Sequence, residues 1–170
     1  MRRDMPTIPN ALIGCAGEHF VAYRLSVLGY VAALTRSGSP YVDLMVGTID
    51  GRASVTIQVK TARSAFLAPK RKPEETCWYW HVGRKARDLR GDSVFYAFVD
   101  LKVSSGELSK SSETPDIFVV PADFVADHLN AYPKSSKNPT DFWFDIGIKD
   151  KNKWFEAWRL IIDRLETCNV

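Results

Sequence analysis

Three polar side chains in two neighbouring segments have the types and spacing that phosphate-ester hydrolysis needs. They are the carboxylate of Asp43, the amide of Gln58 and the amine of Lys60. Carboxylate and amide oxygens suit Mg²⁺, which commonly keeps several waters beside one or two carboxylates. A lysine near such an ion can orient or deprotonate an attacking water and stabilise negative charge in the transition state. The set therefore predicts metal-assisted hydrolysis, provided that the fold brings the three side chains together.

Two predicted β-strands with a tight turn between them would bring these side chains together. The strands are residues 41–46 and 54–60, and Asp50-Gly51 between them is a strong signal for a two-residue hairpin loop. That loop places Asp43 directly opposite Gln58, and the lysine a diagonal step away. Directly opposed Cβ atoms lie about 4.5–5.5 Å apart, and diagonal neighbours about 7–8 Å. The register therefore predicts one compact polar site.

The other face of this hairpin is apolar, so it is the expected core face. Valine, leucine and isoleucine alternate with the polar residues in both segments. A helix predicted over residues 11–28, capped by Asn10 and stopped by Gly29, carries Glu18 on its apolar stripe. A carboxylate on that stripe is costly unless it is paired or bound to a cation. Glu18 is therefore a candidate fourth member of the site, and the alternative is a helix-edge glutamate that reaches water.

An acidic residue followed fifteen positions later by Gln-x-Lys, with a glutamate on an upstream helix, resembles the PD-(D/E)xK nuclease superfamily. The segments that carry the resemblance are Gly17-Glu18, Pro40-Tyr-Val-Asp43 and Gln58-Val-Lys60. An insertion separates the proline from the aspartate, and glutamine replaces the usual second carboxylate. The Gln-x-Lys form is similar to that of intron-encoded homing endonucleases and Mrr-type restriction endonucleases. The resemblance is close over residues 10–63 and general over the later elements.

This resemblance implies a restriction-endonuclease-like α/β fold, in which a central mixed β-sheet is flanked by helices. It also implies a metal-dependent endonuclease that hydrolyses DNA phosphodiester bonds with Mg²⁺ or Mn²⁺. The expected catalytic residues are then Asp43, Gln58, Lys60 and Glu18. The expected metal ligands are Asp43, Gln58, Glu18 and the backbone carbonyl of Val59. A neutral amide would hold the ion more weakly than a carboxylate, unless Glu18 compensates.

Basic residues gather in the middle of the chain, although the net charge of the whole protein is only +3. Between Lys60 and Arg90 there are nine basic residues and three acidic ones. Such a cluster can neutralise phosphates, and a solvated loop would have the same composition. The residues expected to contact nucleic acid are Lys70, Arg71, Lys72, Arg84, Lys85 and Arg87. A single small domain that cleaves both strands of DNA needs a partner, so a homodimer is expected.

Length and composition indicate one soluble domain over residues 1–170, with 45% hydrophobic and 25% charged residues. No apolar run approaches the roughly 20 residues of a membrane helix, so no membrane association is expected. Three cysteines without metal-site spacing favour a reducing cytoplasm, and the three histidines are scattered. Further strands are predicted over residues 30–34, 78–82, 94–99, 117–120 and 142–144. Helices are predicted over residues 121–129 and 154–165, and loops over residues 64–76, 104–114 and 131–140.

Two other functions stay open at this point. Gln58 in place of a glutamate also motivates a second hypothesis, a catalytically inactive module that keeps the fold and binds DNA or protein. The aromatic stripe of the helix over residues 154–165 would suit a protein-interaction surface, although such a stripe is more commonly core. The sequence does not choose between restriction, homing, junction resolution, repair and defence, or reveal which DNA sequence or structure is recognised.

Overall fold

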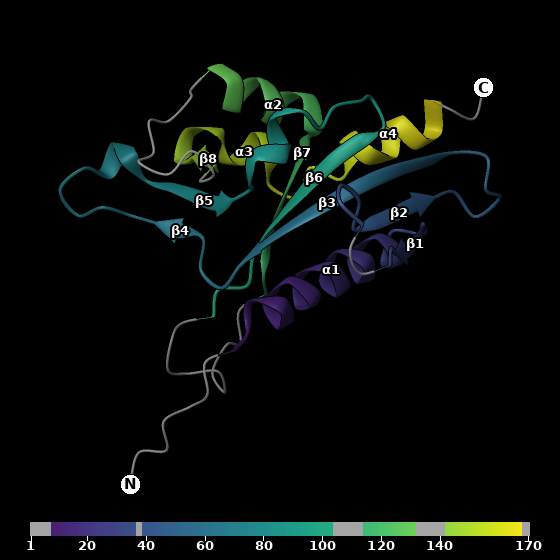
Figure 1. Cartoon of the computed structure of the whole chain (residues 1–170), viewed down its shortest axis with the longest axis horizontal. Helices are drawn as coiled ribbons and strands as arrows, with labels where there is room; N and C mark the ends of the chain where they lie inside the picture. The colour runs from purple at the N-terminus through teal and green to yellow at the C-terminus, as the bar shows by residue number, and fades with distance from the viewer. Residues whose placement is uncertain (1–7, 37–38, 104–113, 132–141, 168–170) are drawn as a thin grey trace, which may run out of the picture.

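The computed structural model describes residues 8–36, 39–103, 114–131 and 142–167, and the structural statements below concern these ranges. Figure 1 shows the arrangement of the elements. In chain order they are α1 (Asn10–Val27), β1 (Val31–Leu34), β2 (Leu44–Gly47), β3 (Ser54–Ala62), β4 (Phe66–Leu67), η1 (Pro73–Glu75), β5 (Cys77–His81), η2 (Arg84–Arg87), β6 (Val94–Asp100), β7 (Asp116–Pro121), α2 (Ala122–Ala131), β8 (Trp143–Gly147), η3 (Ile148–Asp150), α3 (Lys151–Trp154) and α4 (Arg159–Thr167).

A mixed sheet with the strand order β1-β2-β3-β6-β7 forms the centre of the fold (Figure 1). β1, β2 and β3 form an antiparallel meander, β3 pairs in parallel with β6, and β6 pairs antiparallel with β7. A parallel pair needs a crossover connection. The chain between β3 and β6 supplies it as an excursion that carries β4, η1, β5 and η2. The predicted α/β class, with a central mixed sheet flanked by helices, is confirmed.

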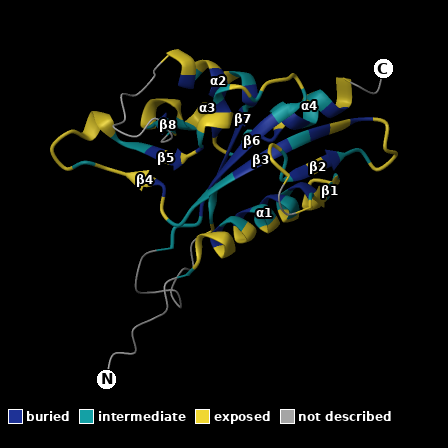
Figure 2. Ribbon diagram, viewed as in Figure 1, coloured by how far each residue is buried: buried dark blue, intermediate teal, exposed yellow. Residues whose placement is uncertain are grey.

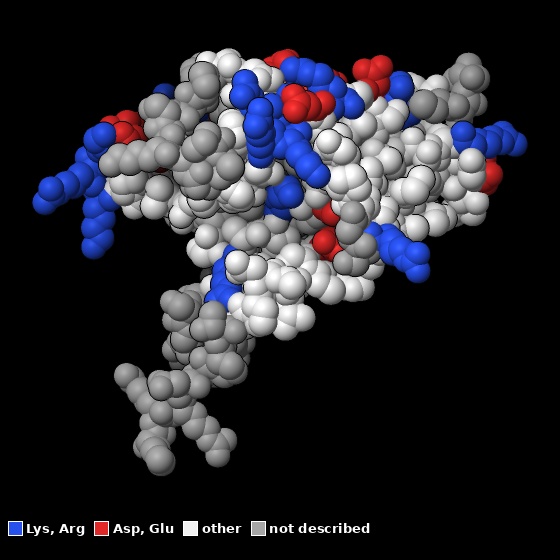
Figure 3. Space-filling view, in the orientation of Figure 1, with Lys and Arg blue, Asp and Glu red and all other residues white. Residues whose placement is uncertain are grey.

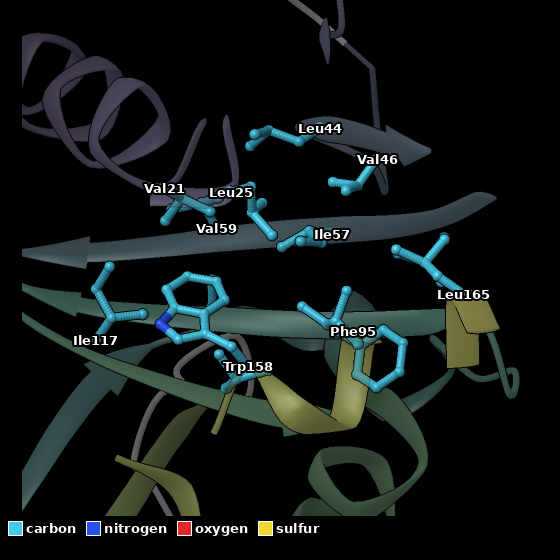
Figure 4. Packing of buried hydrophobic residues seen from close by; sticks show 14 of the residues in the cluster. Val21, Leu25, Leu44, Val46, Ile57, Val59, Phe95, Ile117, Trp158 and Leu165 are labelled. Atoms are coloured by element: carbon cyan, nitrogen blue, oxygen red, sulfur yellow. The ribbon is translucent and has the colours of Figure 1, made fainter. Parts of the chain in front are cut away.

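Successive side chains of β3 point alternately to the two faces of this sheet. Ile57 and Val59 point to one face, where α1 and α4 cover them. Figure 4 shows Leu25 of α1 and Trp158, the residue before α4, directed toward these strands, and each of the four side chains is at most 6% exposed. Burying a large apolar side chain contributes about 1.5–3 kcal/mol. This layer therefore fixes α1 against β3.

A second layer covers the opposite face of the central sheet. β4, β5 and β8 form a separate antiparallel sheet in that order. The Trp80 ring of β5 packs against Phe98 of β6 and Phe118 of β7, with ring centroids 5.1 and 5.6 Å apart. Its Nε1–H donates to the Val99 carbonyl at 2.9 Å. Together with α2 and α3, these residues form a second core between the two sheets, visible as buried ribbon in Figure 2.

The hairpin keeps the predicted register, but its loop is longer than predicted. Leu44 pairs with Ile57, which is the predicted alignment. The connection runs from Thr48 to Ala53, and the Thr48 N–H donates to the Ala53 carbonyl at 3.1 Å. The prediction of a two-residue loop is therefore wrong. Because the longer loop is symmetric about Asp50-Gly51, equal numbers of residues are added on each side and the register is unchanged.

The first helix has a different cap from the one predicted. α1 begins at Asn10 itself, the residue that caps it is Pro9, and no side-chain hydrogen bond caps it. The Pro9 carbonyl accepts from the Leu12 N–H at 3.0 Å. Asn10 is therefore the first helical residue rather than the cap. The helix ends at Val27, just before the predicted stop at Gly29.

The helix predicted over residues 154–165 is wrong as a continuous element. The chain leaves α3 at Phe155, which forms an isolated bridge with Phe118 of β7, and Glu156 adopts a φ of +50°. The Glu156 carboxylate accepts hydrogen bonds from Arg24 of α1 and from the Trp158 Nε1–H. These contacts replace a turn of helix and tie the C-terminal segment to α1.

The predicted loops have mixed outcomes. The segment 64–76 contains β4 and η1, so it is not wholly loop. The segments 104–114 and 131–140 lie almost entirely outside the described residues. In the part of the chain that is described, no helix is long and apolar enough to cross a membrane.

Trp80→Phe should weaken the attachment of the second sheet to the central sheet. The ring stays apolar, but the buried Val99 carbonyl loses the indole donor, and an unsatisfied buried acceptor costs about 1–3 kcal/mol. The free energy of unfolding from urea titration measures the loss. Tyr79→Phe is the matched control on the outward face of the same strand, with an expected change within about 0.5 kcal/mol. Equal stability of the two variants would contradict this account.

Candidate functional site

The regular ladder between β2 and β3 stops at the Leu44–Ile57 pair, and Asp43 lies just beyond it. The Asp43 N–H donates to the Ile57 carbonyl at 2.9 Å, which is one residue out of register with the ladder. The Asp43 carboxylate then replaces a backbone partner. Its Oδ2 accepts from the Val59 N–H at 2.7 Å and from the Nε2 amide of Gln58. We call this end of the ladder, formed by Asp43, Gln58 and Val59, the notch.

Gln58 and Lys60 lie on the face of β3 opposite to α1, beside β6. Gln58 pairs in register with Tyr96 of β6, and Lys60 with Phe98. A pocket of about 130 Å³ opens between this part of the sheet and η2. Its lining includes Tyr41, Gln58, Lys60, Arg84, Lys85 and Tyr96. The structure therefore brings the predicted Asp43, Gln58 and Lys60 to one place, with the pocket beside them.

A close crossing of α1 over β3 brings Glu18 to the same region. Gly17 lies so near Thr61 that an added Cβ would stand 1.9 Å from the Thr61 Oγ1. Only glycine permits this approach, because the obstacle is the side chain of Thr61 on the adjoining strand, whose Oγ1 is buried. Glu18 follows Gly17 directly, as Lys60 precedes Thr61. The half-buried Glu18 is accordingly close enough to Asp43 and Lys60 for their charges to act on it.

Burial and mutual charge shift the acid–base properties of this group. Burial raises the pKa of the Glu18 carboxyl, and the negative charge of Asp43 raises it further. Burial also raises the pKa of Asp43, which the Val59 N–H and the Lys60 ammonium oppose. Burial lowers the pKa of Lys60, against the attraction of the two carboxylates. Two acids and one lysine are thus partly buried close together. Shifted pKa values of this kind are common in functional sites.

The oxygen atoms around the notch fit a hard cation such as Mg²⁺. Asp43 uses Oδ2 for both of its hydrogen bonds, and among the described residues Oδ1 accepts none. The carbonyl of Val59 points to the same side of the strand as its N–H, and therefore toward Asp43. Glu18 adds a second carboxylate, which lies close enough to Asp43 for the charge of Asp43 to act on it. Two carboxylates with several waters are a common Mg²⁺ environment.

Gln58 is the weakest of the predicted metal ligands in this arrangement. Its amide nitrogen donates to Asp43, so its amide oxygen is directed away from that carboxylate. Within the described ranges, no group of three or more His, Cys, Asp and Glu residues could hold a metal by itself. An ion at the notch would therefore depend on water and on the neutral oxygens of Gln58 and Val59.

The predicted nucleic-acid-binding residues form two groups, one on η2 and one in the turn between β4 and β5. Arg84 and Lys85 line the pocket, and the Lys85 Nζ lies 5.2 Å from the centre of the Tyr41 ring. Arg87 points instead to α2, where its Nε–H donates to Asn130 Oδ1 at 2.8 Å. Figure 3 shows basic side chains around the upper part of the molecule, above a hollow that contains acidic atoms.

Lys70, Arg71 and Lys72 lie far from the notch. They belong to the turn between β4 and β5, at the left-hand end of Figure 1. Cys77 marks that end of β5, and the pocket lies at the other end, beside Gly83. Six residues of extended chain span about 20 Å. The structure therefore does not join this basic run to the site.

Tyr96 lines the same pocket, and it is not among the candidate residues predicted from the sequence. Its apolar neighbours in β6 mark it as core, and only 2% of its surface is exposed. The signal that could have found it is the parallel pairing of β6 with β3, which puts Tyr96 beside Gln58. That pairing depends on a crossover of about thirty residues, since parallel strands are never joined by short turns.

Comparison with known proteins supports the fold. No protein-family model matches this chain, and no curated protein matches it in sequence. Among solved structures, the chain is similar to a bacterial homing endonuclease, with a TM-score of 0.52 and 16% sequence identity. The similarity covers 92% of this chain and 95% of that protein. The chain therefore has a nuclease-like α/β fold of the kind seen in that endonuclease.

Gly17→Ala should separate α1 from β3 and destabilise the protein. The added methyl group meets the side chain of Thr61, so the helix must shift, and overpacking of this kind costs about 1–3 kcal/mol. Gly14→Ala is the matched control, because nothing lies within 4 Å of the added Cβ. On the same helix it should stabilise by about 0.5–1 kcal/mol. Thermal unfolding of both variants measures the difference, and two equal shifts would contradict the close crossing.

Glu18→Gln should stabilise the metal-free protein at pH 7 and lose that advantage in acid. The folded-state pKa of Glu18 is raised above 4.5, so the wild-type protein loses stability as the pH rises from 4.5 through the folded-state pKa. Below pH 4.5 the carboxyl is protonated in both states and the variant gains nothing. Urea unfolding in EDTA at pH 7 and pH 3.5 tests this, with exposed Glu74→Gln as control. A Glu18→Gln gain that is equal at both pH values would argue against it.

Proposed function

We propose that this protein is a metal-dependent endonuclease that hydrolyses DNA phosphodiester bonds. The observation that carries the proposal is the meeting of Asp43, Gln58 and Lys60 where β2 leaves β3, with Asp43 bonded to Gln58 and Val59. The fold shared with a bacterial homing endonuclease supports it. The pocket beside Lys60, lined by two further basic residues, supports an anionic substrate.

The roles of the site residues follow from their positions. Asp43 Oδ1, the Val59 carbonyl and Glu18 would hold Mg²⁺ or Mn²⁺, with Gln58 orienting Asp43 through its amide. The bound ion would neutralise phosphate charge and acidify a bound water. Lys60 would orient or deprotonate the attacking water, because burial lowers its pKa and makes the neutral amine easier to form. In its charged form, it would stabilise the negative charge of the transition state.

A homodimer is the proposed assembly for cutting both DNA strands. One notch per chain hydrolyses one bond at a time, so paired cuts need two copies. The edge strand β1 and its neighbour β2 leave apolar side chains open, with Val31 53% and Met45 52% exposed. An open edge strand can pair with a second copy.

A catalytically inactive module that binds DNA or protein is the second candidate. The observation in its favour is that Gln58 donates its amide to Asp43, which satisfies part of the carboxylate without a cation. This candidate predicts DNA binding without cleavage. It also predicts that Mn²⁺ gives no thermal stabilisation, since only a ligand that binds the folded state raises its stability.

Lys60→Met and Asp43→Asn should each abolish most cleavage of supercoiled plasmid DNA in Mg²⁺ or Mn²⁺. Both substitutions keep side-chain volume and remove a charge that the proposed chemistry uses. Loss of a positioned acid–base group slows hydrolysis by about 10²–10⁴-fold. Lys149→Gln is the control, because Lys149 is exposed in η3 at the other end of β5. Gel assays of initial nicking rates give the measurement.

Unchanged cleavage in both site variants would eliminate the proposed mechanism. Absence of cleavage by the wild-type protein, together with DNA affinity and no Mn²⁺-dependent rise in Tm, would favour the inactive module. Cleavage by wild type and by Lys149→Gln, but not by the site variants, is the result that the proposal requires.

A further inference from the structure

The pocket beside the notch is lined by both apolar and basic side chains. Val82, Ala86 and Leu89 contribute apolar walls, while Lys60, Arg84 and Lys85 contribute the charged groups. Its volume of about 130 Å³ lies below the roughly 300–1,000 Å³ of pockets for drug-sized ligands. The space therefore suits one small group with negative charge.

The basic side chains around this pocket have little compensation inside it. Arg84 forms no ion pair or hydrogen bond within the part of the chain that is described. Lys85 contacts the Tyr41 ring, which is an attraction that leaves its charge in place. Among the residues that the structure describes, no aspartate or glutamate lines the pocket. Two surplus cations thus face a cavity next to Lys60, where an anion would be attracted.

Tyr96 supplies a neutral donor on the wall of the same pocket. The residue is 2% exposed, its ring stacks on Phe98 with centroids 5.3 Å apart, and it lines the pocket. Among the described residues, none forms a hydrogen bond with its hydroxyl. Burial and the charge of Asp43 raise the pKa of this phenol, so it stays protonated and able to donate. Thr61 Oγ1 is the fully buried side-chain atom without a partner among the described residues, so the Tyr96 hydroxyl keeps some exposure, and from the pocket wall it can donate to a bound acceptor.

Gly83 positions Arg84 and Lys85 at the pocket that Tyr96 lines. It joins β5 to η2 with a φ of +78° and a ψ of 166°, a conformation that is almost confined to glycine. The turn directs the chain from the second sheet across the mouth of the pocket, so Arg84 and Lys85 begin η2 at its rim. Hydrogen bonds between Arg87 and Asn130 hold η2 on α2. The rim is therefore built into the fold before any ligand binds.

We propose that this pocket binds a phosphate of the DNA strand next to the one that is cut, through Arg84, Lys85 and the hydroxyl of Tyr96. The inference rests on the proposed nuclease function and extends it to a subsite and a new binding residue. A phosphate carries the negative charge that the rim lacks and accepts several hydrogen bonds at once. Lys60, between the notch and the pocket, would then lie between two successive phosphates of one strand.

Thymidine 3′,5′-bisphosphate tests this subsite without a known cleavage sequence, because it carries two phosphates on one nucleoside. Calorimetry at low salt in EDTA keeps the measurement independent of metal. Arg84→Gln should weaken binding about tenfold, and Tyr96→Phe about threefold to tenfold, since each removes a hydrogen bond to a charged acceptor. Lys149→Gln, at the far end of β5, should bind as the wild-type protein does. Unchanged Tm values in the variants exclude a loss of fold.

Binding that is equally strong in all four proteins, or no binding by the wild-type protein, would overturn the subsite. A loss in Arg84→Gln with no loss in Tyr96→Phe would remove Tyr96 from it. Plasmid cleavage by the wild-type protein separates the two proposals. Cleavage with unaltered bisphosphate binding in the variants defeats the subsite alone, whereas the expected binding losses without any cleavage defeat the nuclease and leave a phosphate-binding pocket.

Discussion

The Val59 N–H of β3 loses its backbone partner when β2 leaves the ladder, and the carboxylate of Asp43 replaces that partner at 2.7 Å. An unsatisfied donor in this partly buried position would cost about 1–3 kcal/mol. The hydrogen bond therefore fixes the Asp43 side chain as part of the sheet. Because Oδ2 is committed to the backbone and to Gln58, Oδ1 is the oxygen that the proposed metal site would use. The pocket, the close crossing of α1 and the side chain of Lys60 all lie next to this fixed carboxylate.

Much of the site could be predicted from the sequence because it depends on local rules. The period-two alternation of β3 separated Ile57 from Gln58, and the turn signal at Asp50-Gly51 gave the correct register in spite of the wrong loop length. The end of the ladder at Leu44 could not be predicted, since a strand stops pairing for reasons of tertiary packing. The position of Tyr96 beside Gln58 could not be predicted either, because it depends on the parallel pairing of two strands that are distant in the sequence.

The C-terminal segment illustrates how tertiary contacts override a helical pattern. Residues 154–165 have an amphipathic period, but Glu156 departs from it with a positive φ. Its carboxylate gains an ion pair with Arg24 and a hydrogen bond from the Trp158 indole at 2.7 Å. Hydrogen bonds to charged groups contribute about 1.5–3 kcal/mol each, which exceeds the roughly 1–2 kcal/mol that a left-handed residue costs. No pattern in a single sequence reveals that partner, because Arg24 lies on the first helix.

The charged groups in and beside the notch are a source of instability for the folded protein. Burial disfavours the charged forms of Glu18, Asp43 and Lys60, and the attraction between Lys60 and the two carboxylates opposes this only in part. The surrounding layers offset the cost: α1 and α4 bury one face of the sheet, and the aromatic contacts of Trp80 and Phe98 bury the other. A site that destabilises its own fold needs such a core on both sides.

The crossover between β3 and β6 holds most of the residues that would face a ligand, while the notch belongs to the meander before it. The hydrogen bonds of the central sheet do not pass through the tip of the β4–β5 turn or through η2. Related chains could therefore lengthen, shorten or recharge these two segments without disturbing Asp43 or Lys60. Under the proposed nuclease function, divergence of specificity and preservation of the reaction would then be separate evolutionary processes, confined to different stretches of one polypeptide.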